Sequence, residues 1–460
     1  MPRLIVIGGG VGGLSAAHRA MSRHPELDVL VLEGSARIGG AIATEITDGF
    51  VIDRGPEAAI TNKGGLMELV DELDLRRSLT QTNPNNRGAY FVQDNGLKRV
   101  PSGTSIAGTA DLRALRKSRL LSFTGSMRAS LEPFVSVKLD GEDESVATFV
   151  IRRYGREFYD RIAQPMASGI YGGRAESLSM QATLERFVQL EQRSGSVTKG
   201  LAFEQSNDSN TASEGARYGL FVNFDRGMQV LIDALAERLR DRIQTNTRVT
   251  KLDRVRDHWH VNTENGESFS ADYVAVALGA TQASALLGDS MPDVAKVLRG
   301  VSHGSAAIVT LAYRRDHIEH PLDAYGFVVA SREASPILAS TWSSQKWPSR
   351  APDGFVLLRV FVGNETHKHL FTASDSALVD IAHGGLASLV HIKSAPLFSR
   401  VDRFIDAMPR YTLGHQKRSN ALQEHLRHLP NFSLSTIAFG GVGIPDAIRN
   451  ARGAVDRMLR

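Results

Sequence analysis

The first sixty residues show the clearest pattern of apolar and polar segments. The apolar run Leu4–Ile7 predicts a buried strand, and the six residues that follow it, Gly8–Gly13, include five glycines. An apolar stripe over Leu14–Met21 predicts a helix, and Asp28–Glu33 is typical of a second strand. Strand, glycine turn, helix and strand in this order predict an α/β unit with a parallel sheet.

The middle of the chain has a different texture. The amphipathic stretches Leu66–Leu73 and Phe149–Ile162 predict short helices between polar loops. Ser194–Glu214 is rich in Ser, Asn, Gly and Gln, which predicts a surface loop or insertion. Farther on, Ala306–Tyr313 and Val356–Val362 predict strands of a strand-rich region.

A second α/β section begins near Phe221. The apolar positions from Met228 to Leu239 repeat at helical spacing, and Tyr273–Gly279 predicts another buried strand. The chain ends with a glycine turn, Gly440–Gly443, that leads into a helix predicted over Ala447–Leu459.

Length and composition restrict the class of protein. A chain of 460 residues predicts two or three domains, and no apolar run reaches the roughly 18 residues of a membrane-spanning helix. The N-terminus passes from Met1 directly into a strand, without the apolar region of a signal peptide. We therefore expect a cytoplasmic protein, either soluble or peripheral on the inner face of the membrane.

The chain contains no cysteine, which excludes disulfides, thiolate metal sites, cysteine-ligated iron–sulfur clusters and a redox-active dithiol. The 54 basic residues exceed the 50 acidic ones by only four and are dispersed, so no nucleic-acid partner is expected. An anionic small molecule or a membrane surface remains compatible with this charge.

The glycine turn carries a dinucleotide-binding fingerprint. Gly8, Gly10 and Gly13 have the G-x-G-x-x-G spacing, between a strand and a helix, and Glu33 follows 20 residues after the last glycine. Such a turn allows a pyrophosphate to approach the backbone at a helix N-terminus, while the acid accepts from ribose hydroxyls.

FAD suits this sequence better than NAD. Just after Glu33, the segment Ser35–Gly40 offers Arg37 and two glycines that can enclose a second stretch of pyrophosphate. No second fingerprint of the same kind follows a predicted strand, so no NAD(P)H site is evident. This pattern favours a flavoenzyme of the oxidase type.

Several further motifs accompany the fingerprint. They are Asp53–Glu57, Gln164–Gly173, Thr341-Trp342 with Lys346-Trp347-Pro348, Met408–Tyr411 with Gly414-His415, and Gly441–Asp446. Together with the fingerprint and Arg37-Ile38-Gly39-Gly40, they are similar to the amine-oxidase superfamily of flavoproteins, and in particular to the oxygen-dependent protoporphyrinogen/coproporphyrinogen III oxidases. The resemblance runs from end to end, except that Ser435-Thr436-Ile437 replaces a usual Thr/Ser-Gly pair.

The resemblance implies an α/β fold of p-hydroxybenzoate-hydroxylase-like topology. It implies a Rossmann-like FAD-binding domain built from non-contiguous segments, a strand-rich substrate domain, and a helical domain of the membrane-associating type. The implied boundaries are 1–60, 221–285 and 425–460 for the FAD domain, 85–200 for the helical domain, and 61–84 with 300–424 for the substrate domain.

The resemblance also implies the reaction. A porphyrinogen, either coproporphyrinogen III or protoporphyrinogen IX, would be oxidised in three two-electron rounds with FAD as cofactor, O2 as acceptor and release of H2O2, in heme biosynthesis. It allows peripheral membrane contact and handover of the product to the next heme-pathway enzyme. The sequence leaves the oligomeric state open.

Site residues follow from the matching motifs. No side chain is expected to act as a catalytic acid or base, since the chemistry is the flavin's. The expected FAD contacts are Gly8, Gly9, Gly10, Val11, Gly12, Gly13, Glu33, Gly34, Arg37, Gly40, Ala41, Gly55, Pro56, Glu57, Ala58, Val249, Val442, Gly443 and Ile444. The expected substrate contacts are Lys63, for a propionate, with Gly169, Ile170, Tyr325, Val328, Ile337 and Phe361.

Several residues also fit a purely structural or surface role. Lys63 could equally be an ordinary surface lysine. His415 lies beside a glycine turn, where a histidine is typically a structural hydrogen-bonding residue. Three close histidine pairs lack the spacing of a metal site, so no metal is expected. The basic cluster Arg113–Arg119 is compatible with anionic lipid but also with a solvated helix face.

Two other functions share the same scaffold. An amine oxidase or a carotenoid desaturase would use the same FAD domain, and a protein of another class could bind FAD without catalysis. An amine oxidase should carry an aromatic pair facing the flavin, and a desaturase should carry a long apolar tunnel.

Overall fold

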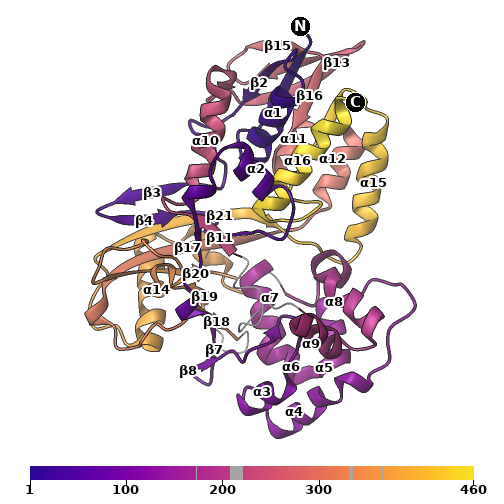
Figure 1. Ribbon diagram of the computed structural model, residues 1–460. Coiled ribbons are helices and arrows are strands. Elements are labelled where there is room, and N and C mark those ends of the chain that lie inside the picture. Colours follow the sequence, from indigo (N-terminus) through magenta and orange to yellow (C-terminus); the bar gives the residue numbers. More distant parts are fainter. Residues whose placement is uncertain (172–173, 208–220, 331–334, 365) are drawn as a thin grey trace.

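The computed structural model describes residues 1–171, 174–207, 221–330, 335–364 and 366–460, without the side chain of Ile170. Figure 1 shows three units. A sheet with flanking helices lies at the top together with both termini, a strand-rich unit lies at lower left, and a group of helices lies at lower right. The mixed α/β architecture expected from the sequence is confirmed.

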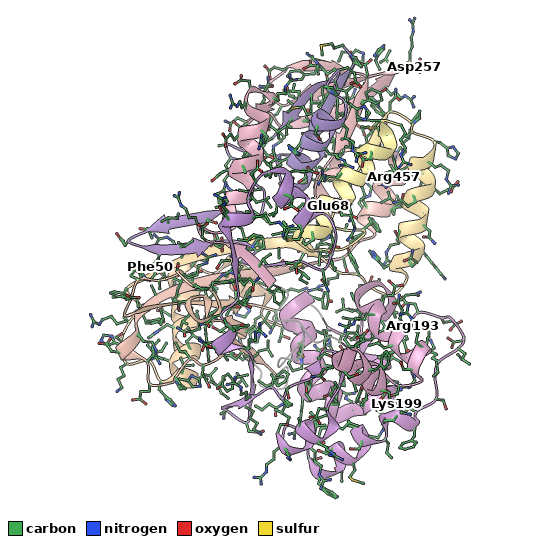
Figure 2. All side chains as sticks on the ribbon, in the orientation of Figure 1. Phe50, Glu68, Arg193, Lys199, Asp257 and Arg457 are labelled. Carbon is green, nitrogen blue, oxygen red and sulfur yellow. The ribbon has the colours of Figure 1, made fainter. Side chains whose placement is uncertain are left out.

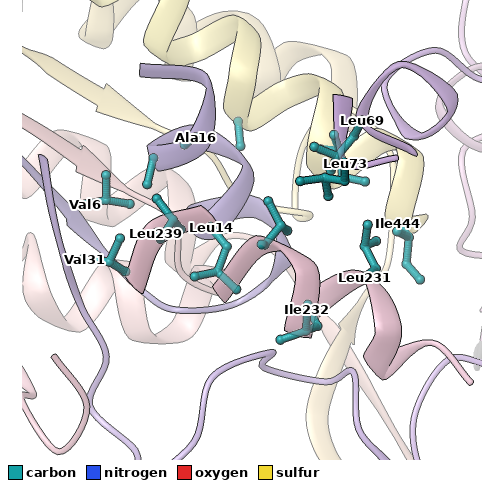
Figure 3. Close-up of a cluster of buried hydrophobic side chains, with 14 of the residues drawn as sticks. Val6, Leu14, Ala16, Val31, Leu69, Leu73, Leu231, Ile232, Leu239 and Ile444 are labelled. Atoms are coloured by element: carbon teal, nitrogen blue, oxygen red, sulfur yellow. The ribbon is translucent and has the colours of Figure 1, made fainter. Parts of the chain in front are cut away.

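A five-stranded parallel sheet in the order β12-β2-β1-β16-β22 forms the centre of the upper unit. Its strands are buried on both faces: Leu4 and Val6 contact one core cluster, whereas Ile5 and Ile7 contact another. Helices α1, α10 and α16 cover the first face, as the labelled side chains of Figure 3 show. The elements are β1 (Arg3–Ile7), α1 (Val11–Arg23), β2 (Asp28–Leu32), α2 (Leu66–Glu72), α10 (Gln229–Leu239), β12 (Ile243–Gln244), β16 (Tyr273–Val276), β22 (Phe432–Leu434) and α16 (Ile444–Met458).

The second face of this sheet is covered by a small antiparallel meander and three helices. The meander contributes the buried Trp259, and the helices contribute Leu298 and Leu422, to the same core cluster as Ile5. The elements are β13 (Val249–Val255), β14 (His258–Thr263), β15 (Ser268–Ala271), α11 (Ala280–Leu286), α12 (Pro292–Arg299) and α15 (His415–Arg427).

The strand-rich unit is a seven-stranded sheet in the order β21-β17-β20-β19-β18-β7-β8, with helix α14 on one face. Short pieces connect it to the upper unit. The sheet consists of β7 (Tyr90–Gln93), β8 (Gly96–Arg99), β17 (His303–Arg314), β18 (Gly326–Val329), β19 (Ile337–Thr341), β20 (Phe355–Val362) and β21 (Phe398–Pro409), with α13 (Ser343–Lys346) and α14 (Asp375–Val390). The connecting strands are β3 (Thr44–Thr47), β4 (Phe50–Asp53), β5 (Ala59–Ile60), β6 (Leu79–Gln81) and β11 (Phe221–Phe224).

The helical unit has its own core, which includes Phe149, Phe158 and Phe187 and reaches the seven-stranded sheet at Phe91. Arg193 and Lys199, labelled in Figure 2, lie exposed on two of its helices. The elements are β9 (Thr104–Ser105), β10 (Gly108–Thr109), α3 (Leu112–Lys117), α4 (Phe123–Ser130), α5 (Val146–Tyr154), α6 (Arg156–Phe158), a π-turn (Tyr159–Ala163), α7 (Gln164–Tyr171), α8 (Met180–Ser194) and α9 (Val197–Asn207).

Two local predictions for this unit need correction. The helix expected over Phe149–Ile162 is divided at Gly155, whose φ of 92° ends α5. Most of the loop expected over Ser194–Glu214 is helix α9, which buries Val197 and Leu201 although its composition is polar. Residues 208–214 of that prediction lie outside the described part of the chain.

The packing also moves the expected domain boundaries. Residues 90–99, expected in the helical domain of 85–200, form β7 and β8 of the seven-stranded sheet because β7 pairs with β18. Helix α15 begins at His415, ahead of the expected boundary at 425, and packs with the upper unit through Leu422. Among the described residues, no helix is long and apolar enough to cross a membrane.

Candidate active site

The fingerprint loop lies at the carboxyl end of β1, where its glycines have different surroundings. At Gly8, with φ +110°, a Cβ would lie 2.5 Å from the carbonyl oxygen of Ala277. At Gly13 it would lie 1.9 Å from the carbonyl oxygen of Gly8, so both positions require glycine for the strand, turn and helix to pack. At Gly10 the nearest atom is Gly40 Cα at 4.0 Å, and the φ of −72° suits any residue.

The acid of the fingerprint lies against this loop. The Glu33 carboxylate accepts from the Gly9 N–H at 2.7 Å and from the backbone and hydroxyl of Ser35 at 2.8 and 2.7 Å. Its backbone also accepts from Thr247 N–H, and a Cβ at Gly34 would meet Arg248 at 3.2 Å. The start of β13 at Val249 therefore follows residues that contact Glu33 and Gly34, two other expected FAD contacts.

The second glycine segment forms the opposite wall. Gly39 N–H donates to the Gly9 carbonyl at 2.8 Å, and Gly40 faces Gly10. The Arg37 guanidinium donates to the backbone carbonyls of Ile38, Gly40 and Ile42, which fixes the conformation of its own segment. The amides at the first turn of α1 and this glycine pair form a cradle that a side chain at position 10 would fill, and that fits a pyrophosphate.

The segment Gly55–Ala58 continues this wall, but Glu57 does not face it with its side chain. Gly55 packs against the Ala41 carbonyl, at 1.9 Å from its would-be Cβ. The Glu57 carboxylate accepts from Ser343 at 2.7 Å and pairs with Lys346 at 3.1 Å and Arg359 at 2.9 Å. Burial would raise the pKa of the Glu57 carboxyl, but the two cations hold it well below its usual range. The carboxylate is thus engaged in joining this segment to the seven-stranded sheet.

The last glycine turn completes the rim at the N-terminus of α16. Val442 precedes this helix, Gly443 is its N-cap and Ile444 its first residue. A Cβ at Gly12 would lie 3.7 Å from the Ala447 carbonyl oxygen, so α16 starts beside the fingerprint helix. The Lys63 ammonium, on a side chain 48% exposed, donates to the buried Asp446 carboxylate at 2.9 Å.

One face of the seven-stranded sheet lies toward the glycine loops, since Arg359 of β20 donates to the Gly55 carbonyl. Along β20, Leu358, Val360 and Val362 contact α14, so the alternate residue Phe361 lies on the other face. Phe361 pairs with Ala339 of β19, and a Cβ at Gly169 of α7 would lie 3.2 Å from Val328 and 4.0 Å from Ala339. The structure therefore brings Gly169, Val328 and Phe361 together on one face.

One of the expected substrate contacts, Ile337, lies on the opposite face of the sheet, whereas Tyr325 stays a prediction. The pairing of β19 with β20 shifts between Ile337 and Ala339, and this bulge turns Ile337 toward α14, where it is 3% exposed and lies beside Gly385. Tyr325 is buried, and its hydroxyl donates to the Asn83 carbonyl at 2.7 Å. The side chain of Ile170 lies outside the described part of the structure.

Sequence reasoning missed two residues that hold the site together. Arg359 donates to the Gly55 carbonyl and lies 5.8 Å from the Phe361 ring centroid, so it contacts both the expected cofactor segment and the expected substrate face. Tyr411 belongs to the motif Met408–Tyr411, but sequence reasoning assigned it no role. Its hydroxyl hydrogen-bonds to Ile437 and Gly441 of the last glycine turn. The remaining motif residue, His415, stacks between Tyr411 and Phe439.

Comparison with known proteins agrees with this geometry. Curated relatives include the coproporphyrinogen III oxidase of Bacillus subtilis, 29% identical over 99% of this chain and 97% of its own length. The mitochondrial protoporphyrinogen oxidase of Nicotiana tabacum is 27% identical over 99% of this chain and 94% of its own.

Solved structures show the same fold. A crystal structure of an Exiguobacterium sp. protein, named as a protoporphyrinogen oxidase, matches with a TM-score of 0.88 and 29% identity. The match covers 99% of this chain and 98% of that one. Wild-type putrescine oxidase matches with a TM-score of 0.69 at 19% identity, over 100% of this chain and 99% of that one. The family model of flavin containing amine oxidoreductases matches residues 11–459. The chain therefore belongs to the flavin containing amine oxidoreductase family.

Proposed function

We propose that this protein is an FAD-dependent porphyrinogen oxidase of heme biosynthesis, with O2 as acceptor. The observation that carries the proposal is the likeness, over nearly the whole chain, to relatives named as porphyrinogen oxidases. Putrescine oxidase shares the fold at only 19% identity, so the amine-oxidase alternative has weaker support, and the desaturase alternative rests on the sequence resemblance alone.

FAD is the flavin that these residues suit. The cradle of Gly10 and Gly40 at the first turn of α1 fits a pyrophosphate, which FAD has and FMN lacks. The cofactor residues expected from the sequence would hold it along one rim, with Glu57 contributing its backbone while its carboxylate binds Lys346 and Arg359.

The strand-rich unit and α7 would hold the porphyrinogen. Gly169, Val328 and Phe361 offer a small, mostly apolar surface against which a flat macrocycle can lie. A bound flavin would supply the redox chemistry: in each round the macrocycle would lose a hydride to it and a proton to solvent, and the two electrons with two protons would then convert O2 into H2O2. The protein's own residues bind and orient the macrocycle, and no acid or base among them is needed.

We further propose coproporphyrinogen III as the preferred substrate. It carries four propionates whereas protoporphyrinogen carries two, so a cation beside the pocket matters more for it. The Lys63 side chain is half exposed, so its ammonium would bind a propionate while it remains paired with Asp446. Arg449 also pairs with Asp446 at 2.7 Å, so that carboxylate keeps a partner when Lys63 is removed.

The test is oxygen uptake by the purified protein with each porphyrinogen, together with its visible flavin spectrum. We expect FAD and turnover of both substrates, and FAD that neither porphyrinogen reduces under anaerobic conditions would contradict the proposal. Lys63→Ala should raise KM for coproporphyrinogen III about 5- to 20-fold, raise it less for protoporphyrinogen IX, and leave the FAD content intact. Lys393→Ala, which removes an exposed lysine paired with Glu319, is the matched control.

Peripheral membrane contact is a separate proposal, supported by one observation. Five large apolar side chains between residues 123 and 139 are at least half exposed: Phe123, Met127, Leu131, Phe134 and Leu139. The basic cluster Arg113–Arg119 precedes them in the chain. Phe123→Ser with Phe134→Ser should reduce co-sedimentation with phosphatidylglycerol vesicles, and equal sedimentation of both proteins would contradict it.

A further inference from the structure

The hydroxyl of Tyr411 lies inside the last glycine turn. Tyr411 is 7% exposed, and its hydroxyl donates to the Ile437 carbonyl at 2.8 Å while accepting from the Gly441 N–H at 2.7 Å. One oxygen atom therefore joins two points of the turn that are four residues apart. Burial raises the pKa of the Tyr411 phenol, so the hydroxyl keeps its proton for the first of these bonds.

Two side chains of α16 also contact this turn: the Arg449 guanidinium donates to the Gly440 carbonyl at 3.1 Å, and the Asn450 amide donates to the Phe439 carbonyl at 3.3 Å. Gly440 and Gly441 have φ values of +84° and +114°, which other residues rarely adopt, and glycines give a backbone more freedom when it is not held. At the end of the turn, the Gly443 N–H donates to Asp446 at 3.3 Å. The phenol fixes the middle of the turn, and Asp446 fixes its end.

The ring that carries the hydroxyl is itself fixed. His415 stacks on the Tyr411 ring with centroids 4.0 Å apart, and Phe439 stacks on the other side of His415 at 5.1 Å. The Tyr411 carbonyl accepts from Ser179 N–H at 2.8 Å, and Leu413 N–H donates to the Ser177 carbonyl at 3.1 Å. Because Tyr411 follows β21 and binds the segment before α8, it lies where the sheet, the helical unit and the last glycine turn meet.

We propose that Tyr411 is a positioning residue for the flavin. Its hydroxyl sets the path of the turn, and the turn sets the place of Val442–Ile444, the expected flavin contacts at the start of α16. The inference rests on the proposed flavin site. It adds that the affinity of this site for the flavin depends on a residue that directly follows the last strand of the seven-stranded sheet and lies outside the dinucleotide-binding fold.

The test is Tyr411→Phe, which removes one oxygen and keeps the stacked ring. Titration of the apoprotein with FAD should give a Kd about tenfold above that of the unchanged protein, because the turn loses both hydrogen bonds of the hydroxyl. The anaerobic rate of flavin reduction at saturating porphyrinogen should fall, with KM little changed.

Tyr313→Phe is the matched control. Its buried hydroxyl hydrogen-bonds to His383 at 2.9 Å on the α14 side of the sheet, so its loss should lower the melting temperature of the apoprotein without changing the FAD Kd. Equal FAD Kd values for both variants and the unchanged protein, with both variants folded, would overturn the proposal. If the unchanged protein binds no FAD, the proposed function fails instead, so the two failures are distinct.

Discussion

Gly8 and Gly10 lie two residues apart in one loop, yet an added methyl group would meet different surroundings at each. At Gly8 it would collide with the Ala277 carbonyl, and the positive φ would strain any other residue. At Gly10 the backbone is ordinary and the space ahead of it is open up to Gly40. The first glycine is therefore needed for folding and the second for the ligand.

This difference makes Gly10→Val a specific test of the cofactor position. The variant should fold with a melting temperature close to that of the unchanged apoprotein, but it should purify without flavin because the side chain fills the pyrophosphate cradle. Gly8→Val should instead lose stability outright. Visible spectra and thermal melts of both variants check this, and a Gly10→Val protein with full flavin content would contradict our placement of the cofactor.

His415 carries a second prediction at this scale. Its Nδ1 is buried and without a hydrogen-bond partner in the described structure, and burial, with Arg418 nearby, lowers its pKa to about 4. The unfolded chain, with a pKa near 6.5, binds a proton below that pH that the folded protein does not bind. Stability is therefore lost as the pH falls from 6.5 toward 4.

His415→Phe keeps an aromatic ring between Tyr411 and Phe439 but removes this titration. Between pH 7 and pH 5 the free energy of unfolding of the unchanged protein should fall about 2 kcal/mol more than that of the variant. Urea denaturation at the two pH values measures it, with the exposed His428→Gln as control. Equal losses in all three proteins would show that another group is responsible.

At the scale of elements, strand β19 shows what periodicity predicts and what it misses. The apolar runs Ala306–Tyr313 and Val356–Val362 predicted β17 and β20 to within a few residues. A bulge has no such pattern, and the one between Ile337 and Ala339 places Ile337 on the opposite face from Ala339. The fingerprint loop was predictable because its chemistry is local, whereas the partners of Glu57 are nearly three hundred residues away in sequence.

The bulge gives opposite expectations for two residues proposed from the sequence as substrate contacts. Ile337→Ala opens a cavity against α14 and should cost about 2–4 kcal/mol of stability with KM unchanged. Phe361→Ala, on a partly exposed side chain of the other face, should cost less stability and raise KM several-fold. Denaturation curves measure the stability of both variants, and oxygen uptake measures their KM. A raised KM for Ile337→Ala would contradict its assignment to the α14 face.

At the scale of the whole molecule, the proposed cofactor contacts come from segments more than four hundred residues apart. The fingerprint loop, the Gly40–Gly55 wall and the start of α16 are held at one rim by β1, β2, β16 and the packing of α1 on α16. The strand, glycine turn and helix of the fingerprint were predictable from the sequence alone, whereas α9 was expected as a loop. The membership of β7 and β8 in the distant sheet was not, because it depends on pairing with β18 across more than two hundred residues.

Because these segments converge on one ligand, FAD should stabilise the folded chain as a whole. At a free FAD concentration 100 times Kd, the expected gain is about 2.7 kcal/mol, which for a chain of this length corresponds to a rise of roughly 3 °C in melting temperature. Removal of FAD should lower it by the same amount, and FMN at the same concentration should give a smaller rise because it lacks the pyrophosphate and adenosine. Thermal melts of apoprotein titrated with FAD and with FMN provide the measurement, with Gly10→Val as the variant that should not respond. Equal shifts for FAD and FMN, or an FAD shift retained in Gly10→Val, would mean that the ligand is held somewhere other than this rim.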